Sequence, residues 1–321
     1  MDNRMAVREF LASRRAKISP EMAGLTLFGG RRRVPGLRRE EVAMLAGVSV
    51  DYYTKLERGN LAGTSESVLD AVARALKLDE AERDHLYNLA RASSASGRTK
   101  QRPLQSGTVR PPLQFMLDAI TAAPAFIGNQ HMDIVAANQL GYALYSEMYR
   151  GPARPANHSR FIFLDPRARD FYPNWELAAN TNVALLRTYS GQNPFDKRLA
   201  DLVGELSTRS EEFRIRWAAH NVRRHYAGTK VFHHPVVGEL ELTYEAMDLA
   251  EDPGFRLTVY PAVPGSPSDE RLRLLASWAA TEHIRELAVG PVQEYPVEGQ
   301  PGTPVQLPTQ PAPHSRDVQR S

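Results

Sequence analysis

The sequence predicts a multidomain protein in which an all-α bundle of five helices precedes an α+β domain with a mostly antiparallel sheet. Apolar residues recur at helical spacing through the first 90 residues, and a stretch rich in Ser, Gly, Pro and basic residues follows. Strand-like runs appear only beyond that stretch. A chain of 321 residues can hold two domains with cores. The expected parts are a helical domain at 1–90, a linker at 91–111, a second domain at 112–285 and a Pro-rich disordered tail at 286–321.

Two short helices joined by a tight turn are expected within LRREEVAMLAGVSVDYYTKLERGN, residues 37–60. Gly47 can adopt the left-handed conformation that ends a helix, and Ser49 can cap the next one. Tyr53 and Leu56 would face inward, and such a turn leaves the outer face of the second helix free. That face carries Asp51, Thr54, Lys55 and Arg58. An ordinary helical hairpin with a charged surface would show much of the same pattern.

Three further helices complete the predicted bundle. The first spans residues 4–16, before a Gly-rich basic loop. Thr64–Ser65 would cap another, and Asp79 with Glu82 would form a capping box at the start of the last. His85 lies in that last helix and is interpreted as a surface or core histidine.

The second domain reads as five strands interrupted by helices. A helix beginning at the proline pair of PPLQFMLDAITAA precedes two strands, AFIGN and DIVAAN, and three more strands follow as TKVFHH, ELELTYEAM and FRLTVYPA. Helical periodicity is found at 139–149, 168–190, 196–207 and 210–220, and a last helix is expected at 269–280. A sheet split by helices in this way is typical of an α+β sensor-like domain.

Positive charge is concentrated at the start of the chain. Residues 1–39 contain ten Lys and Arg against three Asp and Glu, although the whole chain carries only +3. Residues 111–321 contain 20 basic and 24 acidic residues. A basic region beside the paired helices favours phosphate contact, because neutralising phosphates releases counterions.

Composition also excludes several classes of protein. The chain has no cysteine, so it has neither a disulfide framework nor a Cys-ligated metal site, and the cytoplasm is the compartment that fits best. No run of about 18 apolar residues exists, and the charged N-terminus does not read as a signal peptide. We therefore expect no membrane contact.

The paired helices resemble a helix-turn-helix of the XRE (Cro/cI-like) class. Counted from Arg39, the small, turn and apolar positions of that motif fall on Ala43, Gly47, Tyr53 and Leu56. The phrase GVSVDYYTKLERG looks like a recognition helix of this class. Where the class often has Gln at the first position, this chain has Arg39, which favours a guanidinium contact over an amide contact. The resemblance implies an XRE-type bundle that binds DNA.

The second half resembles the ligand-binding domain of the MmyB-like transcription regulators of actinobacteria. The matching stretches are NPFDKRLADLVGELSTRSEEFRIRWAAHNV, KVFHHPVVGELELTYEAM and the Asn-Trp pair at 174–175. That family joins an XRE-type helix-turn-helix to a PAS-like domain, and here the resemblance covers residues 1 to about 280. It implies a transcription regulator whose C-terminal half binds a small apolar, fatty-acid-like effector.

Eleven residues are predicted to contact DNA or to position the recognition helix. Ser49 would cap that helix, while Lys55 would read guanine and Thr54 a thymine methyl. The residues expected near base edges are Asp51, Tyr52, Thr54 and Lys55. The residues expected at phosphates are Arg31, Arg32, Arg33, Arg38, Arg39 and Arg58. Because one such motif offers few base contacts, a homodimer on two half-sites is expected.

Aromatic residues of the second domain are candidates for a ligand pocket between sheet and helices. They are Phe126, Tyr142, Tyr145, Phe161, Phe163, Trp175, Trp217, Tyr244 and Tyr260. Arg216 and His220, one turn apart, could hold a carboxylate. The alternative is that most of these aromatics belong to the core and that Arg216 and His220 are a surface or structural pair.

Catalysis and metal binding have little support in the sequence. His220 and His225 are five residues apart, whereas a zinc helix needs a spacing of four to place both imidazoles on one face. GxSxG and P-loop motifs are absent. We therefore expect neither an enzyme, nor a cofactor, nor a metal. A protein-interaction adaptor without a small-molecule effector remains the alternative, and a weak salt dependence of binding would favour it.

Overall fold

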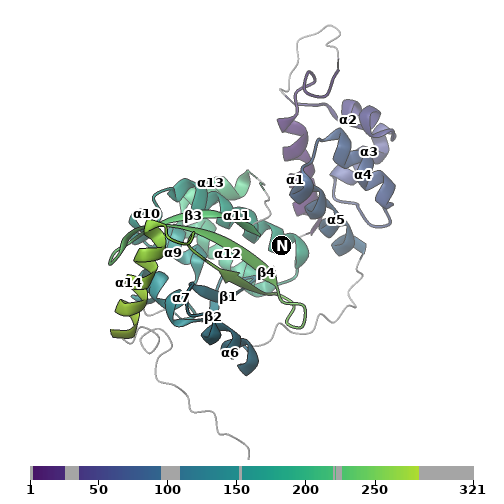
Figure 1. Ribbon diagram of the computed structural model, residues 1–321. Coiled ribbons are helices and arrows are strands. Elements are labelled where there is room, and N and C mark those ends of the chain that lie inside the picture. The colour runs from purple at the N-terminus through teal and green to yellow at the C-terminus, as the bar shows by residue number, and fades with distance from the viewer. Residues whose placement is uncertain are drawn as a thin grey trace, which may run out of the picture.

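The computed structural model describes residues 3–25, 36–94, 109–151, 154–219, 221 and 226–281. Within these ranges a helical domain is followed by an α+β domain, as Figure 1 shows, which confirms the predicted fold class. Several sequence predictions lie outside the described residues: Arg31, Arg32, Arg33, His220, His225 and the tail at 286–321.

Five helices form the first domain. They are α1 (Asn3–Lys17), α2 (Arg39–Ala46), α3 (Val50–Glu57), α4 (Glu66–Ala75) and α5 (Glu80–Ser94). Their apolar faces share one core that includes Val7, Phe10 and Leu86, all fully buried. The caps form as predicted. Ser65 Oγ accepts the Val68 N–H at 3.4 Å, and Asp79 and Glu82 each accept the other's backbone N–H.

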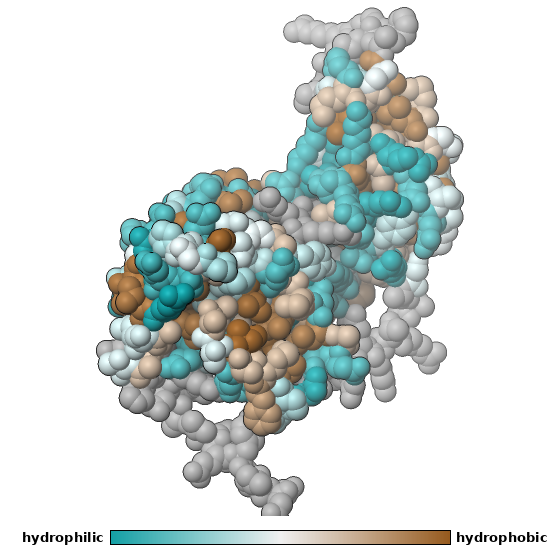
Figure 2. Space-filling view, in the orientation of Figure 1, coloured by the Kyte–Doolittle hydropathy of each residue, from teal (hydrophilic) through white to brown (hydrophobic). Residues whose placement is uncertain are grey.

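The second domain is built on one antiparallel sheet of five strands. These are β1 (Ala125–Asn129), β2 (Ile134–Ala137), β3 (Ala227–His234), β4 (Gly238–Asp248) and β5 (Phe255–Val259), in the order β2-β1-β5-β4-β3. Strand β4 alternates as expected for a sheet with one covered face, since Leu240 and Leu242 are buried while Glu239 and Glu241 are exposed. Figure 2 shows apolar residues gathered where β4 crosses the visible face of this domain.

Helices cover both faces of the sheet. They are α6 (Pro111–Ala119), α7 (Gln139–Leu144), α8 (Ser146–Tyr149), α9 (His158–Leu164), α10 (Arg167–Phe171), α11 (Trp175–Gln192), α12 (Lys197–Arg209), α13 (Glu211–Ala218) and α14 (Pro267–Thr281). Leu113 and Leu117 of α6 pack beside Ile127 and Leu257 on one face. The aromatic core, with Phe126 and Phe232, lies on the other.

Three helix boundaries differ from the prediction. The helix expected at 168–190 is two helices, α10 and α11, because Pro173 supplies no backbone N–H and holds Tyr172 in an extended conformation. Asn174 then caps α11 by accepting the Leu177 N–H at 3.0 Å. Helix α9 was missed, and α5 continues to Ser94, so residues 91–94 belong to a helix and not to the linker.

Candidate DNA-reading helix and ligand pocket

The turn between α2 and α3 has the geometry of a helix-turn-helix. Gly47 ends α2 in the left-handed conformation, with φ 66° and ψ 32°. Ser49 Oγ accepts the Tyr52 N–H at 3.1 Å and so caps α3, as predicted. The backbone N–H of Arg38 donates to Glu41 Oε2 at 2.6 Å, which fixes the start of α2.

Helix α3 buries one side and exposes the other. Tyr53 and Leu56 are 0% and 1% exposed. The outer side carries Asp51, Lys55 and Arg58, all exposed, with Tyr52 and Thr54 half-buried beside them. The orientation predicted for these residues is therefore confirmed, while their contact with DNA stays a prediction.

The arginines near α2 are already engaged with carboxylates. Arg39 donates through Nε and Nη2 to Glu57 Oε1 at 3.0 and 2.9 Å, and Arg15 holds the same carboxylate at 2.9 and 3.0 Å. Burial alone would raise the pKa of Glu57, but the hydrogen bonds from Arg15 and Arg39 lower it. The Arg39 side chain nevertheless remains 50% exposed. Arg38 pairs with exposed Glu40 at 3.3 Å.

A cavity of about 450 Å³ lies between the sheet and α11. Of the predicted ligand residues, Phe126, Tyr244 and Tyr260 line it. The helix side is supplied by α11, through Leu177, Ala178, Thr181, Asn182, Leu185 and Tyr189. The volume falls in the range of small-molecule sites, which runs from about 300 to 1,000 Å³.

The other predicted aromatics do not line this cavity. Tyr142, Tyr145 and Phe161 are buried in the aromatic core, and Phe163 packs edge-on against Phe213. The indole N–H of Trp175 donates to the Ile162 carbonyl at 3.0 Å. Trp217 stacks on Phe213 and holds Arg187 over its ring at 3.9 Å. These side chains pack outside the cavity and do not line it. The sequence could not tell the two cases apart, since aromatic residues fill cores as readily as they line binding sites.

The carboxylate site expected at Arg216 is also not free. Arg216 forms ion pairs with Glu212 and Glu176, and its guanidinium lies 5.0 Å from the centre of the Trp175 ring. These contacts tie α13 to the start of α11. Arg216 is therefore a structural link between two helices, and it is absent from the cavity lining.

Lys230 is the pocket residue that the sequence reasoning missed. It lies on β3 and lines the cavity, with Nζ 4.7 Å from the centre of the Tyr172 ring and 5.2 Å from that of Phe232. Burial lowers the pKa of the Lys230 ammonium to about 8. The strand pattern held the signal, because residues alternate in a strand and Lys230 shares the inward face with Phe232 and His234.

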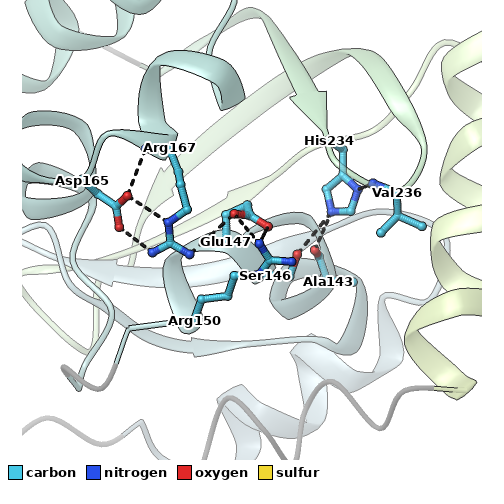
Figure 3. A network of polar contacts seen from close by, with 8 residues as sticks. All are labelled: Ala143, Ser146, Glu147, Arg150, Asp165, Arg167, His234 and Val236. Carbon is cyan, nitrogen blue, oxygen red and sulfur yellow. Dashed lines mark hydrogen bonds and ion pairs between the residues drawn. The ribbon is translucent and has the colours of Figure 1, made fainter.

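A polar network fixes the end of β3 that follows Lys230 (Figure 3). His234 Nδ1 accepts the Val236 N–H at 3.2 Å, so its Nε2–H donates to the Ala143 carbonyl at 3.0 Å. Burial lowers the pKa of His234, which keeps the ring neutral in this role. Next to it, Glu147 pairs with Arg150 at 3.2 Å and lies 3.6 Å from Arg167. The strand that carries Lys230 is thus pinned to α7 and α8.

The two domains meet where α5 packs on α11. His85, 3% exposed, lies edge-on to Phe10 at 4.9 Å and touches the backbone of α11 at Gly191. A Cβ at Gly191 would come within 2.5 Å of His85 Cε1, so only glycine fits there without a shift. Lys17 Nζ also donates to Asn221 Oδ1 at 2.6 Å. His85 is therefore a buried histidine, and its ring lies at the contact between the two domains.

Comparison with protein families accounts for both domains. Residues 10–86 match the model described as a helix-turn-helix domain. Residues 109–275 match the model of the MmyB-like transcription regulator ligand binding domain. The chain belongs to this family of MmyB-like transcription regulators. The chain is thus a transcription regulator in which a helix-turn-helix domain precedes a ligand-binding domain. A comparison with curated proteins found no match.

The described residues contain neither a cluster of metal ligands nor a helix able to span a membrane. No group of three His, Asp or Glu side chains in the described ranges could hold a metal ion. The helices that the structure describes include none that is long and apolar enough to cross a membrane. Both matching families are regulatory.

Proposed function

We propose that this MmyB-like regulator binds DNA through α3 as a homodimer, and that a small apolar, fatty-acid-like molecule in the cavity alters that binding. The observation that carries the proposal is the position of α11. One side of this helix lines the cavity, and its C-terminal end touches α5 of the DNA-binding domain.

The DNA-reading surface is the exposed side of α3. Lys55 and Arg58 project from it without an ion pair among the described residues, and Lys55 has the donors to bind guanine N7 and O6. Asp51 lies in the first turn of α3, where its negative charge interacts favourably with the positive end of the helix dipole. Two such helices in a dimer would read half-sites about one helical turn apart.

The ligand site is a cavity that combines apolar surface with polar side chains such as Asn129, Asn182 and Thr258. Phe126, Tyr244 and Tyr260 offer aromatic surface from the sheet, and Leu177 and Leu185 offer aliphatic surface from α11. This combination is typical of sites that bury most of a small ligand. A molecule that filled the cavity would press on α11 along about three turns.

Movement of α11 can reach the helix-turn-helix through α5. Helix α5 packs on α1 and α4, and α1 contacts α3. Because Gly191 has no side chain, the α11 backbone lies directly against the His85 ring, which is itself packed on Phe10, so a shift of α11 moves that ring. The cavity and the DNA-reading helix are therefore linked through packed elements.

Replacing Gly191 by Ala tests this coupling. The new Cβ would overlap His85, so the α5–α11 contact must open, whereas the helix itself tolerates Ala. Gly204→Ala on α12 is the matched control, because nothing lies within 4 Å of a Cβ there. The measurement is DNA affinity by fluorescence titration of lipid-extracted protein, with and without added dodecanoate, on a fragment that the protein selects from a library.

The wild type and Gly204→Ala should show the same change in DNA affinity on adding dodecanoate, of about fivefold or more. Gly191→Ala should still bind DNA and ligand but lose the change. If Gly191→Ala kept the full ligand effect, α11–α5 packing would not be the route. If dodecanoate did not change the DNA affinity of the wild type, and the wild type bound neither dodecanoate nor the DNA fragment, the proposal itself would be wrong.

A further inference from the structure

We propose that Lys230 is the residue of the cavity that binds the acidic group of the effector, and that it sets the preference of the pocket for an acid over an alcohol of the same chain length. This inference rests on the proposed function, because it assumes that the cavity holds the effector. It goes further by naming the side chain that determines this specificity.

The charged residues of the cavity lining differ in whether they have a partner of opposite charge. Arg256 is held by Asp248 at 2.7 Å, and Asp133 accepts from Asn157 at 2.6 Å and lies 3.7 Å from Arg198. Lys230 has no carboxylate within ion-pair distance in the part of the chain that the structure describes. It is the charged group of the described lining that lacks a partner of opposite charge.

Removing the Lys230 ammonium from water costs free energy. An ammonium taken out of water needs hydrogen bonds or an opposite charge, and aromatic rings replace only part of its hydration. Tyr172 and Phe232 lie 4.7 and 5.2 Å from Nζ, and they supply cation–π contact but no acceptor. A neutral apolar ligand would remove the remaining water from Nζ. A ligand with a carboxylate would replace that water with a charge-assisted hydrogen bond.

The position of Lys230 also determines the orientation of the bound ligand. The acid group would lie against β3, at the side of the cavity formed by Lys230 and Tyr172. The chain of the ligand would then lie along α11, where Leu177, Ala178 and Leu185 form the apolar side. Because β3 is pinned to α7 and α8 through His234, the head group would be held on a fixed element and the chain would bear on α11.

The experiment compares two probes that differ in charge, dodecanoate and 1-dodecanol, on the lipid-extracted full-length protein. Binding is measured by calorimetry for the wild type, Lys230→Met, Lys230→Arg and Lys197→Met. Lys197 is the matched control because it is an exposed lysine of the same domain, on α12, outside the cavity. Circular dichroism confirms that each variant is folded.

The wild type and Lys197→Met should bind dodecanoate about ten- to a hundredfold more tightly than dodecanol, as expected for a hydrogen bond between charged groups. Lys230→Met should bind the two probes with similar affinity, and Lys230→Arg should keep the preference for the acid. Retained preference in Lys230→Met would overturn the assignment. Equal binding of both probes by the wild type would also overturn it, while leaving an apolar effector site intact. Binding of neither probe would reject the proposed effector class as well.

Discussion

Two charged side chains of this molecule, one buried and one half-buried, are treated in opposite ways. Glu57 in the first domain is 3% exposed and is held by two arginines, whereas Lys230 in the second has no carboxylate partner among the described residues. The Glu57 carboxylate stabilises the fold of the first domain, because its partners come from α1 and α2 and join these helices to α3. The unsatisfied charge lines a cavity. Charges without partners are therefore the better candidates for binding groups.

The largest expected effect is on the satisfied charge. Glu57→Gln leaves Arg15 and Arg39 without a charged partner and should lower the free energy of unfolding by about 3 kcal/mol. Glu40→Gln is the control, because the Arg38–Glu40 pair is exposed and should contribute well under about 1 kcal/mol. Urea unfolding of both variants measures the difference. Equal effects would mean that the Glu57 cluster is not a structural centre.

Lys55 on the exposed side of α3, a second lysine without an ion pair in the part of the chain that the structure describes, extends the comparison to the proposed DNA surface. Lys55→Ala should cost about 1–3 kcal/mol of affinity on the selected site and relax one base position. Arg91→Ala is the control, since this exposed arginine lies on α5, away from α3. Titration against the selected site and its single-base variants is the measurement. An equal loss on every sequence would show that Lys55 contacts only phosphate.

The smallest expected effect comes from pH. Burial lowers the pKa of Lys230 to about 8 before the ligand binds, and a bound carboxylate would raise it again. Affinity for dodecanoate is therefore full below pH 8 and falls as pH rises through 8, by up to about tenfold between about pH 7 and pH 9.

Other titratable groups of the cavity lining bear on this test. They are Asp133, His158, Tyr172, Tyr189, Tyr244, Arg256 and Tyr260. Burial raises the pKa of Tyr172, Tyr189 and Tyr260, so these three stay neutral across that range. Dodecanol, whose binding needs no charge on Lys230, should show no change. A parallel fall for both probes would indicate a general loss of structure instead.

The sequence predicted the fold better than it predicted the cavity. Caps and turns are local, so Gly47, Ser49 and the Asp79–Glu82 pair could be placed from neighbouring residues alone. The break between α10 and α11 was missed, although it is also local and Pro173 was sufficient to predict it.

The cavity depends on contacts between distant segments. Trp175 and Phe126 are both buried aromatics, and only the packing of α11 on the sheet decides that Phe126 lines the cavity while Trp175 faces Ile162. Arg216 pairs with Glu212, one helical turn before it, which the local sequence could predict, and with Glu176, 40 residues away, which it could not. Lys230 could have been found from strand alternation, since it occupies the same face of β3 as the buried Phe232 and His234.

The most direct test of the account is the affinity for dodecanoate, measured with and without saturating amounts of the selected DNA fragment. Binding free energies are reciprocal, so DNA must change the affinity for the ligand by the same factor that the ligand changes the affinity for DNA. The account predicts a change of about fivefold or more. An identical dodecanoate affinity with and without DNA would contradict it, because the cavity and α3 would then act independently.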